Sequence, residues 1–250
     1  MLEFRNVSFQ YTEDEQPMLK DLSFSVADGE FVSVIGASGC GKSTLFRLIN
    51  GLEKPQIGEI LVNGQSIENQ KNYSAFMPQK DLLLPWRTIE KNVLLPMEIM
   101  GNEKTKQKEE CEIVLKQAGL LDYMYKYPKD LSGGMKQRAA FARTLLAGAE
   151  MLLLDEPFSA LDYLTRVDMQ EWLLKQWESL GKTIIFITHD VEEAVFLSKR
   201  IYVIQDRPFC KMESVDVPLS YPRNRDDLTR ADVSELKESL ISKLRKKGAE

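Results

Sequence analysis

The sequence predicts an α/β fold with a wound, mixed sheet, an N-terminal antiparallel β region and an inserted helical lobe. Residues 151–154 and 183–187 are almost entirely apolar, as strands buried on both faces are. Helical segments alternate with strands after residue 31, which is typical of a parallel sheet. The lobe is predicted from residues 84–148, which read mainly as helix.

The first part of the chain is predicted to be mostly β. Apolar and polar residues alternate over residues 2–11 and again over 24–26, as in half-buried strands. A buried strand is expected at 31–35 and a short helix after it, which Gly51 can end. A further strand at 59–62 runs into Asn-Gly, a strong hairpin signal.

In the lobe, Thr88 is predicted to cap a helix that Pro96 kinks or ends. Residues 103–116 are highly charged and predict a helix that faces solvent, and another helix is expected after Leu131. A strand at 74–77 precedes these elements.

The core is predicted to resume after the lobe, with helices at 163–179 and 190–198 and a strand at 201–204. Prolines make the next segment an extended loop, and a terminal helix should dock by an apolar stripe and end in a basic run at 245–247. The stripe comprises Val233, Leu236, Leu240, Ile241 and Leu244.

We expect three parts in a single domain. Residues 1–83 and 149–215 form the α/β core, 84–148 the helical lobe, and 216–250 a short C-terminal extension. A formal net charge of -5 argues against a protein whose main partner is nucleic acid. The absence of a signal peptide or of an apolar run of about 20 residues predicts a cytoplasmic location.

The three cysteines, at positions 40, 111 and 210, are scattered without zinc-site spacing, so we expect reduced thiols. A modified Cys40 would obstruct the phosphate loop described next. The single histidine, His189, excludes a histidine-rich metal centre.

Residues 36–44 have the pattern Gly-x-x-x-x-Gly-Lys-Ser-Thr between a strand and a helix, and we call them the phosphate loop. The glycines let backbone N–H groups turn onto an anion, and Lys42 adds a positive charge. Ser43 is placed to bind Mg²⁺, and the pattern predicts binding of a nucleoside triphosphate. The loop residues expected to contact it are Gly36, Ala37, Ser38, Gly39, Cys40, Gly41, Lys42, Ser43 and Thr44.

Two carboxylates end the strand at 151–154. We assign Mg²⁺ binding to Asp155, and the role of general base or water-orienting group to Glu156. The alternative is an acidic loop after a strand. The strand at 183–187 delivers His189 to the same sheet edge, where it could bond a phosphate oxygen or hold Glu156, although a lone histidine is often a loop or core residue.

A second anion site is predicted at Ser132-Gly133-Gly134, because a capping serine and two glycines precede a helix. Taken alone, this pattern is explained equally by helix capping.

In the order of these motifs the chain resembles the nucleotide-binding subunit of ATP-binding cassette (ABC) transporters, over roughly residues 1–215. The phosphate loop is similar to the family's Walker A motif, residues 131–137 to its signature, and residues 151–156 to its Walker B strand with the catalytic glutamate. The resemblance further places the Q-loop at Gln79, the D-loop at 159–162 with Asp162, the H-switch at His189, and the aromatic residue that stacks on adenine at Tyr11.

The resemblance implies ATP and Mg²⁺ as cofactors, with Ser43, Gln79 and Asp155 on the metal. It implies a head-to-tail homodimer in which Ser132, Gly133 and Gly134 of one chain close over the γ-phosphate held by Lys42 of the other. Gln79 would contact the metal or the attacking water and couple hydrolysis to movement of the lobe, which makes Glu156, His189 and Gln79 the catalytic group.

The family's integral-membrane permease is expected to dock at residues 82–86, an apolar stretch stiffened by proline, although Leu82 and Leu83 could equally pack the lobe. The chain is similar to importers of nitrate, sulfonate, taurine or pyrimidine-type nutrients. This implies two permease subunits, a location on the cytoplasmic side of the membrane, and a periplasmic or lipid-anchored binding protein as an indirect partner.

Two other functions are open. A soluble ABC ATPase acting on DNA or ribosomes would usually carry a long coiled coil or two cassettes, and neither is present here. A small-molecule phosphotransferase would use the same loop to phosphorylate a metabolite.

Overall fold

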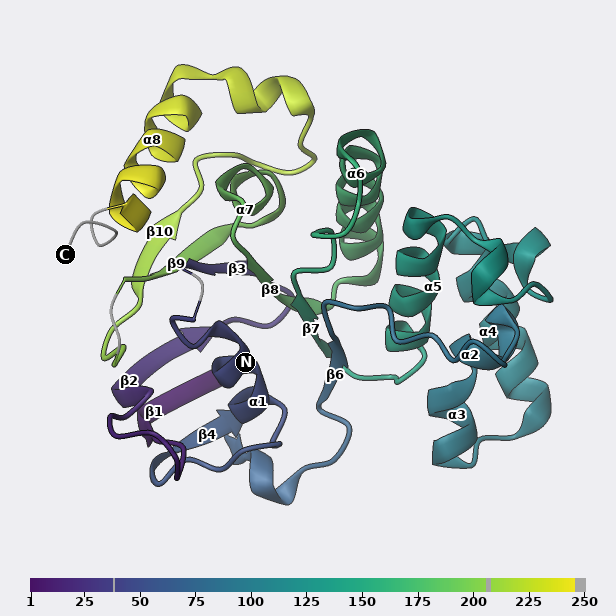
Figure 1. Ribbon diagram of the computed structural model, residues 1–250, viewed down its shortest axis with the longest axis horizontal. Coiled ribbons are helices and arrows are strands. Elements are labelled where there is room, and N and C mark those ends of the chain that lie inside the picture. The colour runs from purple at the N-terminus through teal and green to yellow at the C-terminus, as the bar shows by residue number, and fades with distance from the viewer. Residues whose placement is uncertain (38, 206–207, 246–250) are drawn as a thin grey trace. The chain divides into compact units, whose positions relative to one another are not determined.

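A computed structural model describes residues 1–37, 39–205 and 208–245 (Figure 1). The chain packs into two compact units, one formed by Met1–Tyr73 with Leu180–Glu250 and the other by Ser74–Ser179. The expected division at residues 83, 148 and 215 stays a prediction. In the part of the chain that the structure describes, no helix has the length and apolar character to cross a bilayer.

The first unit begins with an antiparallel sheet, as predicted. Its strands run in the order β2 (Leu19–Val26), β1 (Leu2–Phe9), β4 (Ile57–Val62) and β5 (Gln65–Ser66). Asn63 and Gly64 join β4 to β5 with φ angles of 53° and 75°, the left-handed conformation that the hairpin prediction required. Strand β2 starts before residue 24, because its first residues pair with β1 rather than forming a loop.

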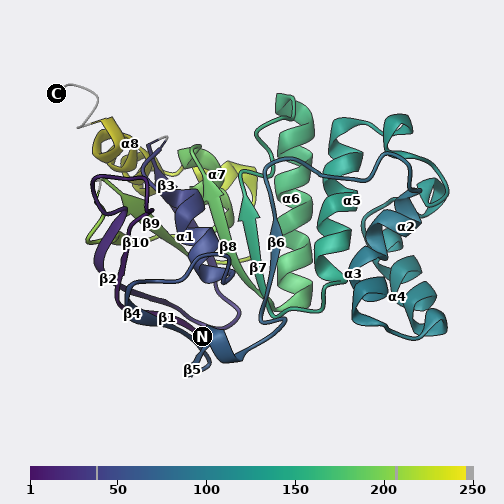
Figure 2. The same cartoon turned by 60° about the horizontal axis from the view of Figure 1, so that its bottom comes forward.

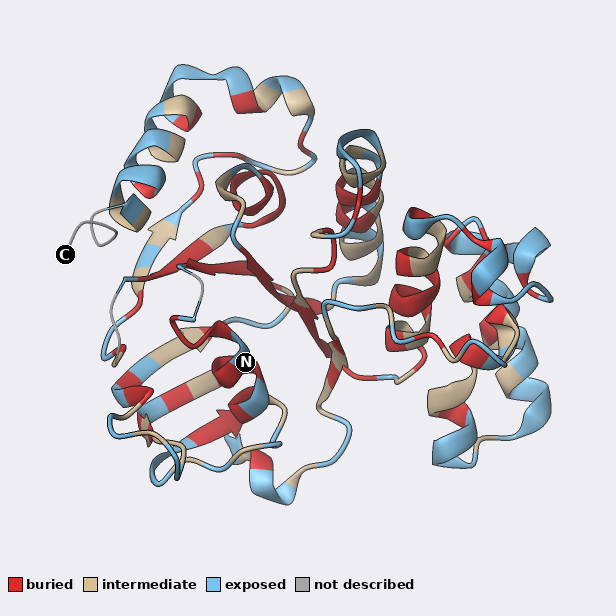
Figure 3. Ribbon diagram, in the orientation of Figure 1, coloured by how far each residue is buried: buried red, intermediate tan, exposed pale blue. Residues whose placement is uncertain are grey.

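The wound sheet of this unit contains β10 (Glu213–Asp216), β9 (Arg200–Ile204), β3 (Phe31–Gly36) and β8 (Thr183–Thr188), in that order. Strand β3 pairs in parallel with both β8 and β9. All residues of β3 and β8 are buried, which explains their apolar composition (Figure 3). The prediction of a loop at 213–216 was wrong, since this segment pairs antiparallel with β9.

The helices of the first unit are α1 (Lys42–Ile49), α7 (Val191–Leu197) and α8 (Ala231–Arg245), with short 3-10 helices at Ile67–Asn69 and Arg225–Thr229. Gly51 follows α1 with φ 69°, as a C-terminal glycine should. Val233 and Leu240 of the α8 stripe are buried, but Ile241 is 38% exposed. Of the predicted basic run, residues 246 and 247 lie outside the described residues.

The second unit holds two parallel strands and a helical layer (Figure 2). The strands are β6 (Ser74–Met77) and β7 (Met151–Asp155). The helices are α2 (Ile89–Val93), α3 (Leu95–Met100), α4 (Lys104–Gln117), α5 (Gly133–Leu145) and α6 (Tyr163–Leu180), with 3-10 turns at Leu121–Tyr123 and Pro128–Asp130.

The lobe helices begin and end where Thr88 and Pro96 predicted, except that Pro96 begins a new helix. The Thr88 hydroxyl accepts a hydrogen bond from the N–H of Lys91, and Pro96 sits in the first turn of α3, so the proline separates two helices. Helix α4 is mostly exposed, but Cys111 and Leu115 point into a core with Val93. The charged helix therefore still has a narrow buried side.

Candidate functional site

The phosphate loop lies between the end of β3 and the start of α1, in the predicted strand-loop-helix context (Figure 1). Gly39 and Gly41 have φ angles of 77° and 106°, which side-chain-bearing residues rarely adopt. A Cβ on Gly41 would also lie 2.7 Å from the Phe209 ring and 2.8 Å from the Met18 sulfur. Gly41 is therefore required twice over, by its conformation and by its neighbours.

Gly36 is required by its close neighbours rather than by a positive φ. It is the last residue of β3, and a Cβ there would lie 2.7 Å from Cys40 Sγ and 3.0 Å from the carbonyl oxygen of Ile204. Cys40 thus packs against the base of the loop. Ser38, also expected to contact nucleotide, lies outside the described residues.

Lys42 holds the loop together. Its ammonium donates to the carbonyl oxygens of Gly36 at 2.8 Å and Ala37 at 3.0 Å, and the residue is only 7% exposed. An ammonium can donate about three hydrogen bonds, so a phosphate oxygen can join or replace these carbonyls. Helix α1 has no acidic residue in its first turn and no side chain capping it, so its N–H groups suit an anion.

Tyr11 is attached to the same loop. Its hydroxyl and that of Thr44 are 3.2 Å apart, and its ring meets Phe9 edge-on with centroids 4.8 Å apart. The residue expected to stack on adenine is therefore held beside the phosphate loop, within one unit.

His189 leaves the sheet at the edge where the phosphate loop begins. Strands β3 and β8 are parallel, with Ile35 opposite Thr188. Gly36, the last residue of β3, and His189, the first residue after β8, therefore leave the sheet side by side. His189 is exposed, and the Asp190 carboxylate after it caps α7. His189 therefore lies beside the start of the phosphate loop, while its delivery to the edge that carries Asp155 and Glu156 stays a prediction.

In the second unit, Gln79 and Glu156 come together. The Gln79 Nε2 donates to Glu156 Oε2 and to Ser159 Oγ, both at 3.2 Å, and the Ser159 hydroxyl donates to the Glu156 carbonyl at 3.0 Å. Glu156 has φ 44°, a conformation that is strained for a residue other than glycine. Ser159 was part of the D-loop pattern, but its contacts with the other two residues could not be foreseen.

Asp155 is the last residue of β7. Because Met77 of β6 stands opposite Leu154 in a parallel pair, Asp155 at the end of β7 and Gln79 just after β6 lie at the same edge. The predicted Mg²⁺ donors are a hydroxyl, a carboxylate and an amide oxygen, a set that fits this hard cation. Among the described residues, no group of three or more His, Cys, Asp or Glu could hold a metal. The three predicted Mg²⁺ ligands stay a prediction.

The predicted second anion site forms the start of α5. The Ser132 hydroxyl accepts from the N–H of Met135 at 3.3 Å, which confirms the cap. A Cβ on Gly134 would lie 2.5 Å from Thr165 Cγ2 of α6, whereas Gly133 is exposed and has more room. Close packing of α5 on α6 therefore explains Gly134, and Ser132 and Gly133 remain at the surface.

Asp162 starts α6 in a similar way. Its carboxylate accepts from the N–H of Thr165 at 3.1 Å, and hydrogen bonding by Thr165 lowers the pKa of Asp162 below its ordinary value. Asp162 should therefore stay ionised to lower pH than an isolated aspartate.

The apolar stretch after Gln79 has two kinds of residue. Leu83 is 7% exposed and packs in the lobe core, whereas Leu82 and Trp86 are 58% and 72% exposed. Arg143 of α5 fixes this stretch by donating to the carbonyl oxygens of Leu82 at 2.8 Å and Asp81 at 2.6 Å. The structure thus supports lobe packing for Leu83 and leaves Leu82 at the surface.

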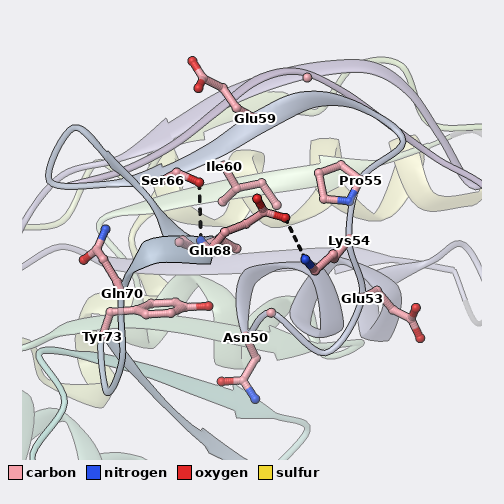
Figure 4. Close-up of a pocket in the computed structure, with 13 residues that line it drawn as sticks. Asn50, Glu53, Lys54, Pro55, Glu59, Ile60, Ser66, Glu68, Gln70 and Tyr73 are labelled. Atoms are coloured by element: carbon pink, nitrogen blue, oxygen red, sulfur yellow. Dashed lines mark hydrogen bonds and ion pairs between the residues drawn. The ribbon is translucent and has the colours of Figure 1, made fainter.

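A well-formed cavity of about 470 Å³ lies elsewhere in the first unit, between the end of α1 and the β4–β5 hairpin (Figure 4). The carboxylate of Glu68 spans it to pair with Lys54 at 3.1 Å, and Tyr73 lies along one wall. None of its lining residues belongs to the phosphate loop. Two other hollows are lined by predicted site residues: one of about 530 Å³ includes Tyr11, and one of about 670 Å³ includes His189.

The cysteines differ sharply in accessibility. Burial raises the pKa of Cys40 and raises that of Cys111 to about 12, while Cys210 is exposed. Each unit of pKa lowers the reactive thiolate fraction about tenfold. We expect a thiol reagent to label Cys210 quickly in the native protein and the other two only on unfolding, as peptide mass mapping would measure; equal rates at all three would contradict this.

Comparison with known proteins identifies relatives over most of the chain. A family model described as ABC transporter matches residues 19–159, more than half of the chain. The formylaminopyrimidine import ATP-binding protein ThiZ of Halalkalibacterium halodurans is 44% identical, over 87% of this chain and 85% of that protein. The aliphatic sulfonates import ATP-binding protein SsuB of Bacillus thuringiensis is 43% identical, over 83% of this chain and 82% of that protein.

A solved structure is similar over the same region. It is a dimeric ATP-binding cassette in a post-hydrolysis state bound to ADP and Pi, with a TM-score of 0.75 and 29% identity. The match covers 88% of this chain and all of the other.

Proposed function

This chain belongs to the ABC transporter family, and on that premise we propose that it is the ATP-binding and ATP-hydrolysing subunit of a nutrient importer. The observation that carries the proposal is the phosphate loop. There the Lys42 ammonium, two glycines with positive φ and an uncapped helix start are gathered in one unit. ATP would bind with its phosphates at this loop and its adenine on Tyr11.

We assign the chemistry as follows. Ser43, Asp155 and Gln79 would hold Mg²⁺, which when bound neutralises charge on the phosphates. Glu156 would accept a proton from the attacking water or orient it, and Gln79, which bonds the Glu156 carboxylate, would hold that carboxylate in position. His189 would donate to a phosphate oxygen.

The second half of each nucleotide site would come from a second copy of the chain. Ser132 and Gly133 are exposed at the start of α5, with Gly134 packed behind them, and the similar cassette of known structure is dimeric. Asp162 at the start of α6 would contribute to the same closure. Two head-to-tail copies would thus enclose two ATP molecules.

Ser132→Arg should separate binding from closure. The larger, charged side chain cannot lie between α5 and a second chain, whereas the phosphate loop is untouched. We expect ATP affinity of the isolated chain to be unchanged and cooperative ATPase activity to be lost, as measured by equilibrium titration and by phosphate release against ATP concentration. Ser132→Ala is the comparison, since it removes the hydroxyl without adding a bulky charged side chain. Full activity of the arginine variant would show that the signature is only a helix cap.

The permease is proposed to dock on the exposed aromatic and apolar residues around Leu82 and Trp86. We include Tyr125 in this proposed surface: it is 68% exposed, and its neighbours Met124 and Lys126 accept backbone hydrogen bonds from Glu90 and Ile89. Such a surface on the lobe is suited to an apolar helix of an integral-membrane subunit. It would place the protein at the cytoplasmic face of the membrane.

The names of the relatives suggest the class of cargo. One imports formylaminopyrimidine and the other aliphatic sulfonates, so we propose a small polar nutrient of the sulfonate, nitrate, taurine or vitamin-precursor class. A periplasmic or lipid-anchored binding protein would capture it, and this chain would not contact it.

The proposal is tested by assaying the purified chain and by isolating it with its membrane partner. We expect ADP and free phosphate as the only products of ATP, and co-purification of the chain with an integral-membrane protein. Transfer of phosphate to a metabolite would indicate the phosphotransferase, and stable association with ribosomes or DNA without a membrane partner would indicate the soluble ABC ATPase.

A further inference from the structure

Helix α7 connects His189 to the C-terminal extension. It has seven residues and begins directly after His189 and Asp190 at the end of β8. The 3-10 helix of the extension and α8 pack against α7 (Figure 1). A helix this short has few backbone hydrogen bonds of its own, so its position depends on what holds its ends.

The extension satisfies the C-terminal end of α7. The carbonyls in the last turn of an α-helix lack partners within the helix. Arg223 Nη1 donates to the carbonyl oxygens of Val195 at 2.9 Å, Phe196 at 3.0 Å and Ser198 at 2.9 Å. The Tyr221 hydroxyl donates to the remaining carbonyl, that of Leu197, at 2.8 Å.

Arg223 is itself fixed in place. It is 6% exposed, its other terminal nitrogen donates to the Leu219 carbonyl at 2.9 Å, and its guanidinium carbon lies 4.0 Å from the centre of the Tyr221 ring. A positive charge at a helix C-terminus is favourable, and a planar guanidinium can reach several carbonyls where an ammonium cannot. The extension therefore holds α7 through one rigid group.

The other end of α7 holds the His189 turn. Asp190 Oδ1 accepts from the N–H groups of Glu192 at 2.8 Å and Glu193 at 3.2 Å. The Thr188 hydroxyl donates to the Glu193 carboxylate at 2.6 Å and accepts from the Asp190 N–H at 3.0 Å. His189 lies inside this set of bonds, so a shift of α7 moves its backbone.

A weaker link runs from α8. Lys237 lies 3.6 Å from the Glu192 carboxylate, whose side chain is 51% exposed. Such a solvent-exposed pair contributes little to holding the helix. The buried Arg223 cluster is the stronger restraint.

We propose that Arg223 is a positioning residue for His189, acting from the C-terminal extension through α7. This rests on the proposed function, in which His189 donates to a phosphate oxygen. The extension is then part of the hydrolytic machinery, although none of its described residues belongs to a predicted nucleotide contact. Releasing Arg223 should loosen the His189 turn and slow hydrolysis without weakening ATP binding.

The test is a double-mutant cycle on the full chain. Arg223→Met should lower kcat by about ten- to a hundredfold, because small misplacements of a reacting group cost this much. The KM for ATP should stay within about twofold, as expected when binding is unchanged. In a His189→Ala background, Arg223→Met should lower kcat no further. The matched control is Arg230→Met in the same segment, an exposed arginine paired with Asp232, which should behave as wild type.

If Arg223→Met lowers kcat by the same factor in the wild-type chain and in the His189→Ala chain, the proposal is overturned, since Arg223 would then act without His189. Tyr221→Phe removes a single hydrogen bond to α7 and replaces Arg223→Met in the test if that variant does not fold. We expect it to lower kcat less than Arg223→Met does, and not at all in the His189→Ala background. Hydrogen exchange separates this inference from the proposed function. Faster exchange at the amides of Asp190 and Glu193 in these variants supports the mechanical link even in a chain that hydrolyses no ATP, and unchanged exchange refutes it.

Discussion

Glu156→Gln is expected to slow ATP turnover by about 10²–10⁴-fold while leaving ATP binding intact. The amide has the shape of the carboxylate, and its oxygen can still accept the hydrogen bond that Gln79 donates to Glu156. What is lost is the negative charge and the ability to take a proton from water. Since hydrolysis is the step that separates the proposed dimer, a dimer should accumulate in ATP.

Single-turnover phosphate release and size exclusion with and without Mg·ATP measure the two effects. Glu178→Gln is the matched control, because Glu178 is an exposed residue of α6. A Glu156→Gln variant that hydrolyses ATP at the wild-type rate would remove Glu156 from the mechanism. A variant that stays monomeric in ATP would contradict the two-copy site.

Lys42→Met is expected to remove ATP binding at the phosphate loop. A hydrogen bond to a charged group is worth about 1.5–3 kcal/mol, and about 1.4 kcal/mol changes affinity tenfold. The variant should therefore bind ATP at least about tenfold more weakly. It also leaves the Gly36 and Ala37 carbonyls without the ammonium that now binds them, so the loop itself should lose order.

Equilibrium titration with a fluorescent ATP analogue measures the loss, and thermal unfolding with and without ATP provides a second readout. Lys54→Met is the control: Lys54 is a well-exposed lysine of the same unit that pairs with Glu68. Unchanged ATP affinity in Lys42→Met would place the nucleotide elsewhere on the chain.

The sequence was sufficient for most elements of the fold. Mainly apolar runs predicted β3, β7 and β8, since strands buried on both faces are built mostly from apolar residues. Local turn chemistry predicted the hairpin at Asn63-Gly64 and the cap at Ser132. Strand β10 was missed because its pairing with β9 decides its conformation, while its own residues resemble a loop.

For the site, the sequence by itself determined which residues carry charge and where glycine is placed. The phosphate loop, the carboxylates after β7 and His189 after β8 follow from local patterns, because each depends on neighbouring residues alone. Only the tertiary structure decided that Gly134 is needed for packing on Thr165, that Glu156 has a strained backbone, and that Arg223 holds α7. These depend on contacts between residues far apart in the chain or on backbone angles that such contacts impose, and no local pattern encodes them.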